Sequence, residues 1–395
     1  MRQPMVAMSR LVEAGRPGNA GSKGGRGLGG VMPVRVGGIE LHAGPTALGG
    51  PDDLDAVIRE FIGGARHTLR IAVQELDSRA VTDAILAARA AGVRVQIILE
   101  GDYLREERPA ADPWAAAGSN EENRLIYAAL LRAGVDLITD LNPAIFHQKF
   151  VVRDDGESTA AVLTGSANFT LTDTGKNPAG TQKAGNNLNH VVVLRGQRAA
   201  SLYLEEFLRM RSGTFGALHE RVEARPAEFR LGRVRVKPLF APRHGPEMEI
   251  MKQMLKASAS VDFAMFTFAR SSGIDDTMIR LAPSMRIRGV LDHGQGVQAW
   301  AATEPLKAAG VELFANRRGT GVRKVHHKLM VVDERLVIAG SFNYTAPATT
   351  LNDENIIVLG DLEETREDAE TGQRAIAAYA LKEIERVITE LAEPA

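Results

Sequence analysis

The sequence contains no cysteine, and this absence excludes two common ways of holding a protein together. With no thiol among its 395 residues, the chain has neither a disulfide framework nor a thiolate metal site. This composition suits a reducing compartment, and we expect a cytoplasmic protein. No stretch approaches the ~20 apolar residues of a membrane span, and the N-terminus lacks the apolar segment of a secretory signal. We therefore expect neither an integral membrane segment nor secretion.

An excess of charge of one sign is also missing. The chain has 48 Lys+Arg and 49 Asp+Glu, a formal net charge of −1 at pH 7. It is not a polycation that would bind nucleic acid or anionic lipid everywhere, so any basic binding site must be local. Motifs that bind metals are missing too, because there is no His-Glu-x-x-His and no carboxylate cluster at ligand spacing. We expect no metal and no other cofactor.

The organisation of the chain indicates a duplication. Residues 1–38 are rich in glycine, and although Gly25–Gly30 formally satisfies G-x-G-x-x-G, no strand precedes it, so we expect a flexible tail. Strand and helix patterns then follow in the same order twice. They predict an α/β fold of two duplicated layered halves, with mixed, mostly parallel sheets flanked by helices and a pseudo-twofold site between them. The predicted domains are 39–223 and 239–395, joined by a crossover at 224–238.

Two similar motifs carry the chemistry. Each has a histidine, a spacer residue, a lysine, a β-like run, an aspartate and then Gly-Ser-x-Asn; the histidines and lysines are His147, Lys149, His326 and Lys328. Because side chains alternate along a strand, the histidine and lysine of each motif share one face. The spacer residue His327 would lie on the opposite face, so we expect it to be structural. Asp154 and Asp333 would also point away, and we expect them to orient or support the motif.

The Gly-Ser-x-Asn segments supply the other polar groups, namely Ser166, Asn168, Ser341 and Asn343. Glycine lets the backbone approach closely, and the asparagine amide can donate to an oxyanion. Two histidines, two lysines and two asparagines that meet across a pseudo-twofold would bind a singly charged tetrahedral anion such as a phosphodiester. One neutral imidazole can attack phosphorus while the other, protonated, gives its proton to the leaving alkoxide. This scheme requires no metal.

The two motifs resemble the signature of the phospholipase D superfamily, His-x-Lys-x-x-x-x-Asp followed by Gly-Ser-x-Asn, over residues 39–390. The resemblance implies a phosphohistidine intermediate on His147, with His326 as the acid. It further implies that phosphate oxygens are held by Lys149, Lys328, Asn168 and Asn343. A glutamate that bonds a histidine ring is also implied, and Glu354 matches it in an Asn-x-Glu pattern. The first half has Asn189 at that place, so we expect the two imidazoles to differ in basicity. One chain carries a complete site, so dimerisation is not required.

The sequence leaves the substrate class open. A basic stretch before the second motif contains Arg317, Arg318, Arg323 and Lys324 without an acidic residue. It would suit a groove that follows nucleic-acid phosphates, although a solvated loop would have the same composition. We rank a nuclease-like phosphodiesterase first. The alternative is a phospholipase D or phosphatidyltransferase acting at a phospholipid surface, favoured by an apolar stretch before His147 and by Trp114 and Trp300. An inactive binding module is the third reading, but both motifs are complete.

Overall fold

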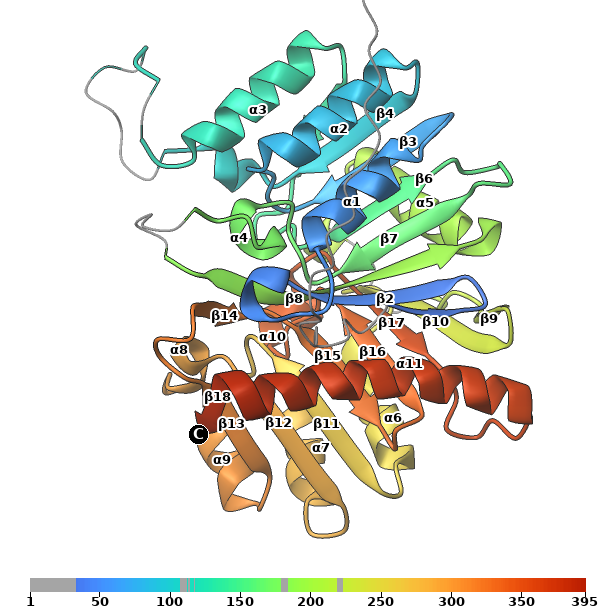
Figure 1. Ribbon diagram of the computed structural model, residues 1–395, viewed down its shortest axis with the longest axis vertical. Helices are drawn as coiled ribbons and strands as arrows, with labels where there is room; N and C mark the ends of the chain where they lie inside the picture. The colour runs from blue at the N-terminus through green and yellow to red at the C-terminus, as the bar shows by residue number, and fades with distance from the viewer. Residues whose placement is uncertain (1–32, 107–111, 113, 117, 179–183, 219–222) are drawn as a thin grey trace, which may run out of the picture. The chain divides into compact units, whose positions relative to one another are not determined.

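Each half of the chain is built around one mixed β-sheet (Figure 1). The computed structural model describes residues 33–106, 112, 114–116, 118–178, 184–218 and 223–395. The helices and strands of the first half are β1 (Val34–Val36), β2 (Ile39–Gly44), α1 (Leu54–Gly63), β3 (Thr68–Val73), α2 (Arg79–Ala90), β4 (Arg94–Leu99), α3 (Glu121–Arg132), β5 (Asp136–Thr139), β6 (Lys149–Arg153), β7 (Ala161–Gly165), α4 (Leu171–Thr174), β8 (Asn186–Arg195) and α5 (Gln197–Arg211).

The second half repeats this order of elements and adds α8, β14 and β18. Its members are β9 (Phe229–Leu231), β10 (Val234–Ala241), α6 (Pro246–Lys256), β11 (Ser260–Met265), α7 (Ile274–Leu281), β12 (Arg286–Leu291), α8 (His293–Gly296), α9 (Thr303–Ala308), β13 (Glu312–Asn316), β14 (Val322–Val325), β15 (Lys328–Val332), β16 (Leu336–Gly340), α10 (Ala346–Thr350), β17 (Glu354–Leu359), α11 (Glu367–Arg386) and β18 (Ala392–Pro394). The duplicated α/β fold is therefore confirmed.

The strand pairing differs from expectation in one respect. The first sheet has the order β1-β2-β8-β7-β6-β3-β4-β5, and the second has the order β18-β13-β12-β11-β15-β16-β17-β10-β9. Parallel pairing joins β3 to β4 and β4 to β5, and likewise β11 to β12 and β12 to β13. The strands that follow each motif histidine, β6-β7-β8 and β15-β16-β17, pair antiparallel. The expectation of mostly parallel sheets was wrong for these strands. A short turn joins β6 to β7 and β15 to β16, and the longer connections that contain α4 and α10 return the chain antiparallel beside the preceding strand.

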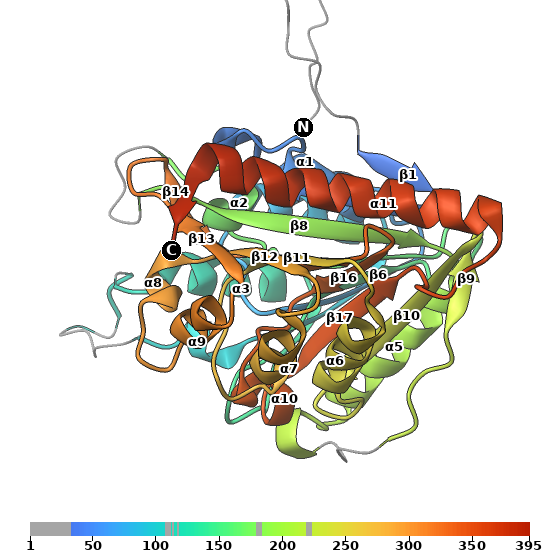
Figure 2. The same cartoon turned by 90° about the horizontal axis from the view of Figure 1, so that it is seen from below.

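Helices cover the outer face of each sheet. Side chains of α1, α2 and α3 pack with the first sheet in one apolar core, and those of α6, α7 and α9 pack with the second sheet in another. Figure 2 shows α11 on the opposite face of the second sheet from α6 and α7. Local sequence explains the helix starts; at α1, for example, the side chain of Asp53 accepts a hydrogen bond from Ala56 N at 3.2 Å.

The two halves interlock within one compact unit, residues 32–395. Strand β14 belongs to the second half but pairs in parallel with β8 of the first sheet. Helix α11 contacts β15 and β16 and also β1 and β2 of the other half. Aromatic rings continue this junction, because Tyr203 packs edge-to-face on Phe150 at 5.2 Å and on Phe240 of the second half at 5.0 Å. Such edge-to-face contacts between buried rings fix the relative placement of the sheets.

Two predicted boundaries require correction. Val34–Val36 lies in the segment expected to be a flexible tail, yet it forms β1 and pairs with β2 across a Gly37-Gly38 turn. Both glycines have positive φ, 54° and 93°, which a two-residue hairpin turn requires. The expected crossover 224–238 likewise contains β9 and the start of β10. The alternating apolar residues of these short hairpins outweigh the loop-like composition around them. The Gly25–Gly30 motif lies outside the described residues.

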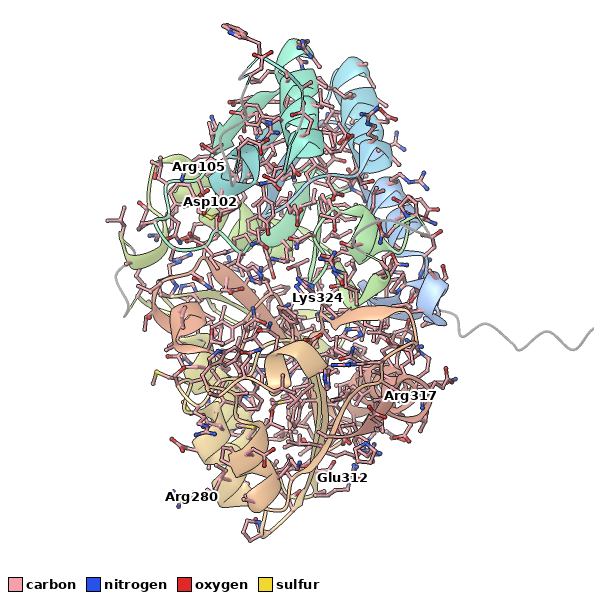
Figure 3. All side chains as sticks on the ribbon, turned by 90° about the vertical axis from the view of Figure 1, so that its left-hand side faces the viewer. Asp102, Arg105, Arg280, Glu312, Arg317 and Lys324 are labelled. Carbon is pink, nitrogen blue, oxygen red and sulfur yellow. The ribbon has the colours of Figure 1, made fainter. Side chains whose placement is uncertain are left out.

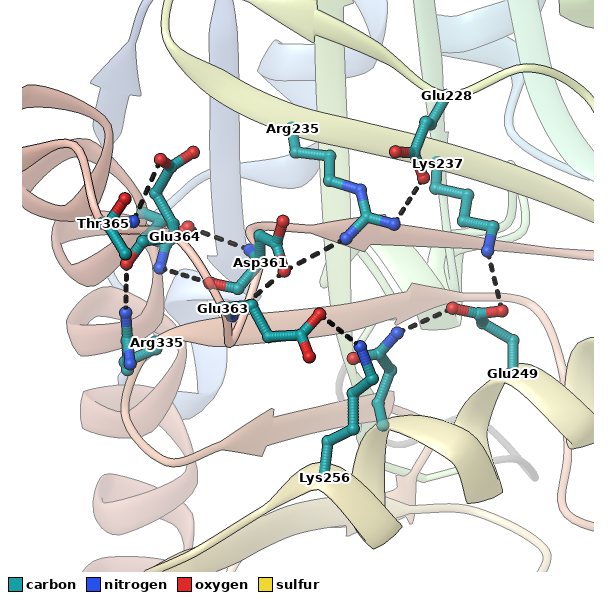
Figure 4. Close-up of polar contacts among 12 residues, drawn as sticks. Glu228, Arg235, Lys237, Glu249, Lys256, Arg335, Asp361, Glu363, Glu364 and Thr365 are labelled. Atoms are coloured by element: carbon teal, nitrogen blue, oxygen red, sulfur yellow. Dashed lines mark hydrogen bonds and ion pairs between the residues drawn. The ribbon is translucent and has the colours of Figure 1, made fainter.

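Charged side chains secure the edge of the second sheet (Figure 4). Lys237 of β10 reaches Glu249 of α6, with an Nζ–Oε2 distance of 2.8 Å, and Arg235 pairs with Asp361 at 3.2 Å. The Lys237–Glu249 pair is largely buried, whereas exposed pairs of this kind add little stability. Strand β10 in turn pairs with β17, where Ala241 lies opposite Glu354. The network therefore supports the strand that brings Glu354 to the centre of the molecule.

Among the described residues, no helix combines the length and the apolar character that crossing a membrane would require.

Candidate active site

A pocket of about 640 Å³ lies between the two halves and contains both motif histidines. His147 and Asn168 line it from the first half, and His326 and Asn343 line it from the second. The two histidines are 179 positions apart in the sequence and the two asparagines are 175 positions apart, and the fold brings all four to one cavity. The four positions predicted from the duplicated motif therefore meet in space.

Each histidine is held by the main chain of the opposite half. His147 N donates to Asp353 O at 2.9 Å, and His326 N donates to Leu188 O at 3.0 Å. Asp353 precedes the first residue of β17, and Leu188 lies near the start of β8. Because these two bonds cross the junction, neither half can fix its own histidine alone.

The side chains that follow those carbonyls hold the imidazole rings. His147 Nδ1 lies 2.6 Å from Glu354 Oε2, and His326 Nδ1 lies 2.9 Å from Asn189 Oδ1. With Nδ1 engaged, Nε2 is the ring nitrogen left for a substrate. Glu354 and Asn189 thus occupy equivalent places, one as a carboxylate and one as an amide. The expected difference between the two imidazoles has this structural cause.

The serine of each Gly-Ser-x-Asn motif binds the same acceptor as the opposite histidine. Ser341 Oγ donates to Glu354 Oε2 at 2.7 Å, and Ser166 Oγ donates to Asn189 Oδ1 at 2.8 Å. The preceding Gly165 has φ +153°, and a Cβ there would lie 2.3 Å from His190 O. Only glycine permits this approach between the strands. The serines therefore orient the groups that orient the histidines.

The two lysines are buried at the centre of the site. Lys149 Nζ donates to His147 O and Lys328 Nζ to His326 O, each at 2.9 Å. Burial lowers the pKa of Lys149 to about 8, and burial together with the charge of Lys149 lowers the pKa of Lys328 well below its usual value. Two buried ammonium groups that repel each other favour an anion between them.

The electrostatic environment also keeps the histidines neutral in the free protein. Burial lowers the pKa of His147 well below the usual value, and the charges of Lys149 and Lys328 lower it further. The same causes, burial first, act on His326. Burial raises the pKa of Glu354 to about 8. Because Glu354 accepts from Ser341, we place the proton that it shares with His147 on Nδ1 of the ring.

The motif aspartates lie away from the pocket and cap main-chain groups. Asp154 Oδ1 accepts from His67 N at 2.7 Å, and Asp333 Oδ1 accepts from Ala259 N at 2.8 Å. Burial would raise the pKa of each carboxyl, but these and neighbouring main-chain bonds outweigh it and lower the pKa. Both carboxylates therefore tie the end of a motif strand to the start of the adjacent strand.

His327 faces away from the pocket, as strand alternation predicts. Its ring stacks on His190 with the centroids 5.5 Å apart, and its Nε2 lies 3.3 Å from Glu383 Oε1 of α11. His190 Nε2 accepts from Gly340 N at 3.1 Å. This buried contact connects α11 with the turn of the second Gly-Ser-x-Asn motif.

The basic stretch divides between two places. Arg323 and Lys324 line the pocket, and Lys324 Nζ lies 5.0 Å from the centre of the Phe266 ring. Arg317 instead bonds Glu390 O at 3.2 Å, and Figure 3 shows it apart from Lys324. Arg318 is exposed and is not among the residues that line the pocket in the described part of the chain. Only half of the predicted basic set faces the site.

Sequence reasoning missed the acidic residues that line the pocket. Glu75 and Asp77 line the pocket after β3, and Asp173 lines it from α4. Nothing in the sequence marks these three residues. In contrast, Asn189 occupies the position in the first half that matches Glu354, and this correspondence indicated that it would lie beside a histidine ring. Of the two tryptophans, Trp300 lines the pocket. Trp114 is exposed and is not among the described residues that line it. Across the described ranges, no three His, Cys, Asp or Glu side chains are grouped as metal ligands.

Comparison with known proteins identifies the family. The protein-family model described as "Cardiolipin synthase, PLD-like domain" matches residues 58–211 and 250–371 of this chain. This match covers more than half of the chain and falls once on each half. The chain belongs to the phospholipase D superfamily and carries two copies of its domain.

Individual relatives match over shorter lengths. The mitochondrial cardiolipin hydrolase of Xenopus tropicalis is 32% identical over 108 residues, which is 27% of this chain and 50% of that protein. A phospholipase D of Rickettsia conorii is 29% identical over 139 residues, 34% of this chain and 65% of that protein. The chain thus spans about half to two thirds of the length of these relatives. The crystal structure of phosphatidylserine synthase from Haemophilus influenzae has the same fold, with a TM-score of 0.61 at 13% identity over 92% of this chain and 88% of that one.

Proposed function

We propose that the protein is a phosphodiesterase that cleaves the head-group ester of phospholipids through a covalent intermediate on His147. The observation that carries the proposal is that both motif histidines line one pocket, while the two buried motif lysines lie directly beside them and donate to His147 O and His326 O. A phosphodiester anion would relieve the repulsion between the ammonium groups. It would also present phosphorus to one imidazole and its leaving oxygen to the other.

The proposed first step forms a phosphorus–nitrogen bond. Nε2 of His147 attacks phosphorus, the bond from phosphorus to the head-group oxygen breaks, and His326 gives its Nε2 proton to the departing alkoxide. Glu354 holds Nδ1–H of His147, which keeps the lone pair on Nε2 and stabilises the positive charge that develops on the ring. Lys149 and Lys328 stabilise charge on the phosphoryl oxygens.

The second step uses the same groups in reverse. The imidazole of His326, now neutral, takes a proton from water or an alcohol, whose oxygen attacks phosphorus and displaces His147. The side-chain amides of Asn168 and Asn343 line the pocket and are suited to holding the phosphoryl oxygens in both steps. Asp173 Oδ2 accepts from the main-chain N–H of Asn168 at 2.7 Å, which fixes this residue from behind.

The charge distribution of the pocket supports a phospholipid substrate over nucleic acid. Lys324 and Arg323 line one side, while Glu75 and Asp77 line the pocket from the other half. A polynucleotide would bring further phosphates toward these carboxylates, at an electrostatic cost. A head group with a single phosphate and an amine would place opposite charges on opposite sides. Trp300, with 44% of its surface exposed, adds an apolar ring at the same pocket.

The names of the relatives point the same way, since they are cardiolipin hydrolase, phospholipase D and phosphatidylserine synthase. A nuclease remains the second candidate. Its specific support is that Arg323 and Lys324 of the basic stretch line the pocket.

The proposal is tested by offering the purified chain several diesters side by side. Vesicles of phosphatidylethanolamine and phosphatidylcholine, vesicles of phosphatidylglycerol, single-stranded DNA and RNA are incubated with the wild type and with His147→Ala. We expect head-group release from vesicles that contain an amine head group, absent in the variant, and no nucleic-acid cleavage. Cleavage of DNA or RNA without head-group release would establish the nuclease instead.

A further inference from the structure

The two halves solve the same structural problem with different side chains. Glu354 performs three tasks: its Oε2 accepts from His147 Nδ1 and from Ser341 Oγ, and its Oε1 accepts from Asn352 Nδ2 at 3.4 Å. In the first half, Asn189 Oδ1 performs only the first two tasks, toward His326 and Ser166. An amide oxygen can orient a ring N–H, but it brings no negative charge.

The third task falls to another residue. Asn187 stands two positions before Asn189, as Asn352 stands before Glu354, and its Nδ2 donates to Asp173 Oδ1. Asp173 is 1% exposed, and its Oδ2 lies 3.8 Å from His326 Nδ1. Asn189 and Asp173 are themselves connected, because Asn189 Nδ2 donates to Asp173 O at 3.3 Å. The functions of one glutamate are thus divided between an asparagine on β8 and an aspartate on α4.

This carboxylate occurs in the first half only. Asp173 follows the motif asparagine Asn168 by five positions, and the residue five positions after Asn343 is Ala348 of α10. The second half has no need of a carboxylate there, because Glu354 already supplies the charge from the strand. The presence of aspartate in α4 coincides with the absence of glutamate in β8.

We propose that Asp173 is the positioning residue of His326, supplying from α4 the negative charge that Asn189 cannot supply from β8. The proposal rests on the phosphodiesterase function and deepens it. A carboxylate bonded directly to His147 suits a nucleophile. At His326, Asn189 takes the direct contact with the ring and the carboxylate of Asp173 lies farther from it. This more distant charge stabilises the protonated ring and still leaves it a good proton donor.

The charges around His326 make this contribution matter. Burial and four positively charged or titratable neighbours oppose protonation of the ring: Lys328 at the start of β15, Lys324 of β14, Lys149 of β6, and His147. Phe266, whose ring centre lies 5.0 Å from that of His326, adds no charge. Asp173 Oδ2, 3.8 Å from His326 Nδ1, is the carboxylate oxygen that the described structure places against this ring, and its negative charge also raises the pKa of His147, against the burial that lowers it. Without it, little of His326 would carry the proton that the leaving group needs.

The test uses two soluble substrates with the same dihexanoyl phosphatidyl group. Phosphatidylethanolamine needs a proton on its leaving group, and phosphatidyl-p-nitrophenol does not. For Asp173→Asn we expect kcat/KM on the ethanolamine lipid to fall about tenfold or more, with the alkaline limb of its pH profile moved to lower pH, since a carboxylate at this range changes a pKa by roughly 1–3 units. The burst of p-nitrophenol that accompanies formation of the phosphohistidine should fall by a smaller factor than kcat/KM on the ethanolamine lipid, because in this step the variant loses only the support that Asp173 Oδ2 gives to Asn168 N. In the double variant Asp173→Asn/Asn189→Asp the negative charge returns to β8. The alkaline limb of its pH profile should therefore lie at higher pH than that of the wild type.

If Asp173 were merely structural, Asp173→Asn would reduce the rates on both substrates by the same factor and leave the alkaline limb of the pH profile in place. That result would overturn the proposal. If Asp173→Asn does not fold, Asn189→Asp alone serves, because a carboxylate bonded to the ring must move the limb upward; an unmoved limb there contradicts the proposal as well. A wild type that cleaves no diester would refute the proposed function itself. An active wild type with unmoved limbs would refute only the role of Asp173.

Discussion

Replacing Glu354 by glutamine tests how much the carboxylate contributes to the nucleophile. The variant keeps the shape of the side chain but removes the charge behind the 2.6 Å contact with His147 Nδ1. Hydrogen bonds to charged groups contribute about 1.5–3 kcal/mol, and about 1.4 kcal/mol is a tenfold change in rate. We therefore expect the burst with an activated diester to slow by roughly 10- to 150-fold. The loss should stay below the ~10⁴-fold seen when a catalytic histidine adopts the wrong tautomer, because Asn189 shows that an amide oxygen can hold Nδ1–H in this fold.

Stopped-flow measurement of the p-nitrophenol burst gives the rate of the first step directly. Glu383→Gln is the matched control, since Glu383 is also a buried carboxylate beside a histidine, but His327 faces away from the pocket. Both variants should lose stability, whereas only Glu354→Gln should slow the burst. A burst unchanged within about threefold in Glu354→Gln, or slowed equally in both variants, would contradict the reasoning.

Three other predictions follow from the charges of the structure. Activity should change by less than about twofold in EDTA, because the lysines take the place of a metal at the phosphate; loss in EDTA with rescue by a divalent ion would refute this. Next, kcat/KM should be higher near pH 5.5 than near pH 8, because His326 must be protonated and its pKa lies well below 6.5 in the free protein; a rise over that range would contradict it. Finally, the buried His42 lies 3.5 Å from Glu40 and 3.4 Å from Asp52, and although burial lowers its pKa, the two carboxylates raise it overall. Its contribution is complete below the unfolded pKa and is lost as the pH rises through the folded one, so His42→Gln should reduce the free energy of unfolding by about 1.5–3 kcal/mol near pH 5.5 and by less near pH 8.5; urea titrations showing an equal loss at both values would refute it.

The sequence predicted those parts of the site that repeat. The spacing of histidine and lysine predicted that both would reach the site, and they do, although each strand begins only at the lysine and the histidine precedes it by two residues. Gly-Ser-x-Asn predicted the asparagines, which line the pocket. The structure adds the contacts between halves. The partners His147 and Glu354 are 207 residues apart, and no local pattern states which ring a given carboxylate reaches.

Asp173 shows the limit of motif reasoning most clearly. It belongs to neither copy of the motif. Its position beside His326 depends on how α4 packs against β8 and on the hydrogen bonds that Asn187 and Asn189 donate to it. The same limit applies to strand pairing. The alternation of strands and helices predicted mostly parallel pairing, but β6, β7 and β8 pair antiparallel, since a short turn joins β6 to β7 and the segment with α4 returns the chain antiparallel beside β7.

Short hairpins escaped the sequence analysis for a different reason. The segments of β1 and β9 have only three residues each, too few for their alternation to stand out from a loop. Their turns meet in the fold, where a Cβ on Gly37 would lie 2.8 Å from the Cα of Gly232. This close approach leaves no room for a side chain on Gly37, and neither segment alone indicates it.

The central claim is that His147 forms the covalent bond with phosphorus, and locating that bond tests it most directly. Wild type and His326→Ala are mixed with dihexanoyl phosphatidyl-p-nitrophenol, quenched at alkaline pH where phosphohistidine survives, digested and analysed by mass spectrometry. The account predicts a phosphatidyl adduct on His147 that accumulates in His326→Ala, because that variant cannot activate the second nucleophile. An adduct on His326 in the wild type, or turnover through a burst with no adduct on His147, would contradict it.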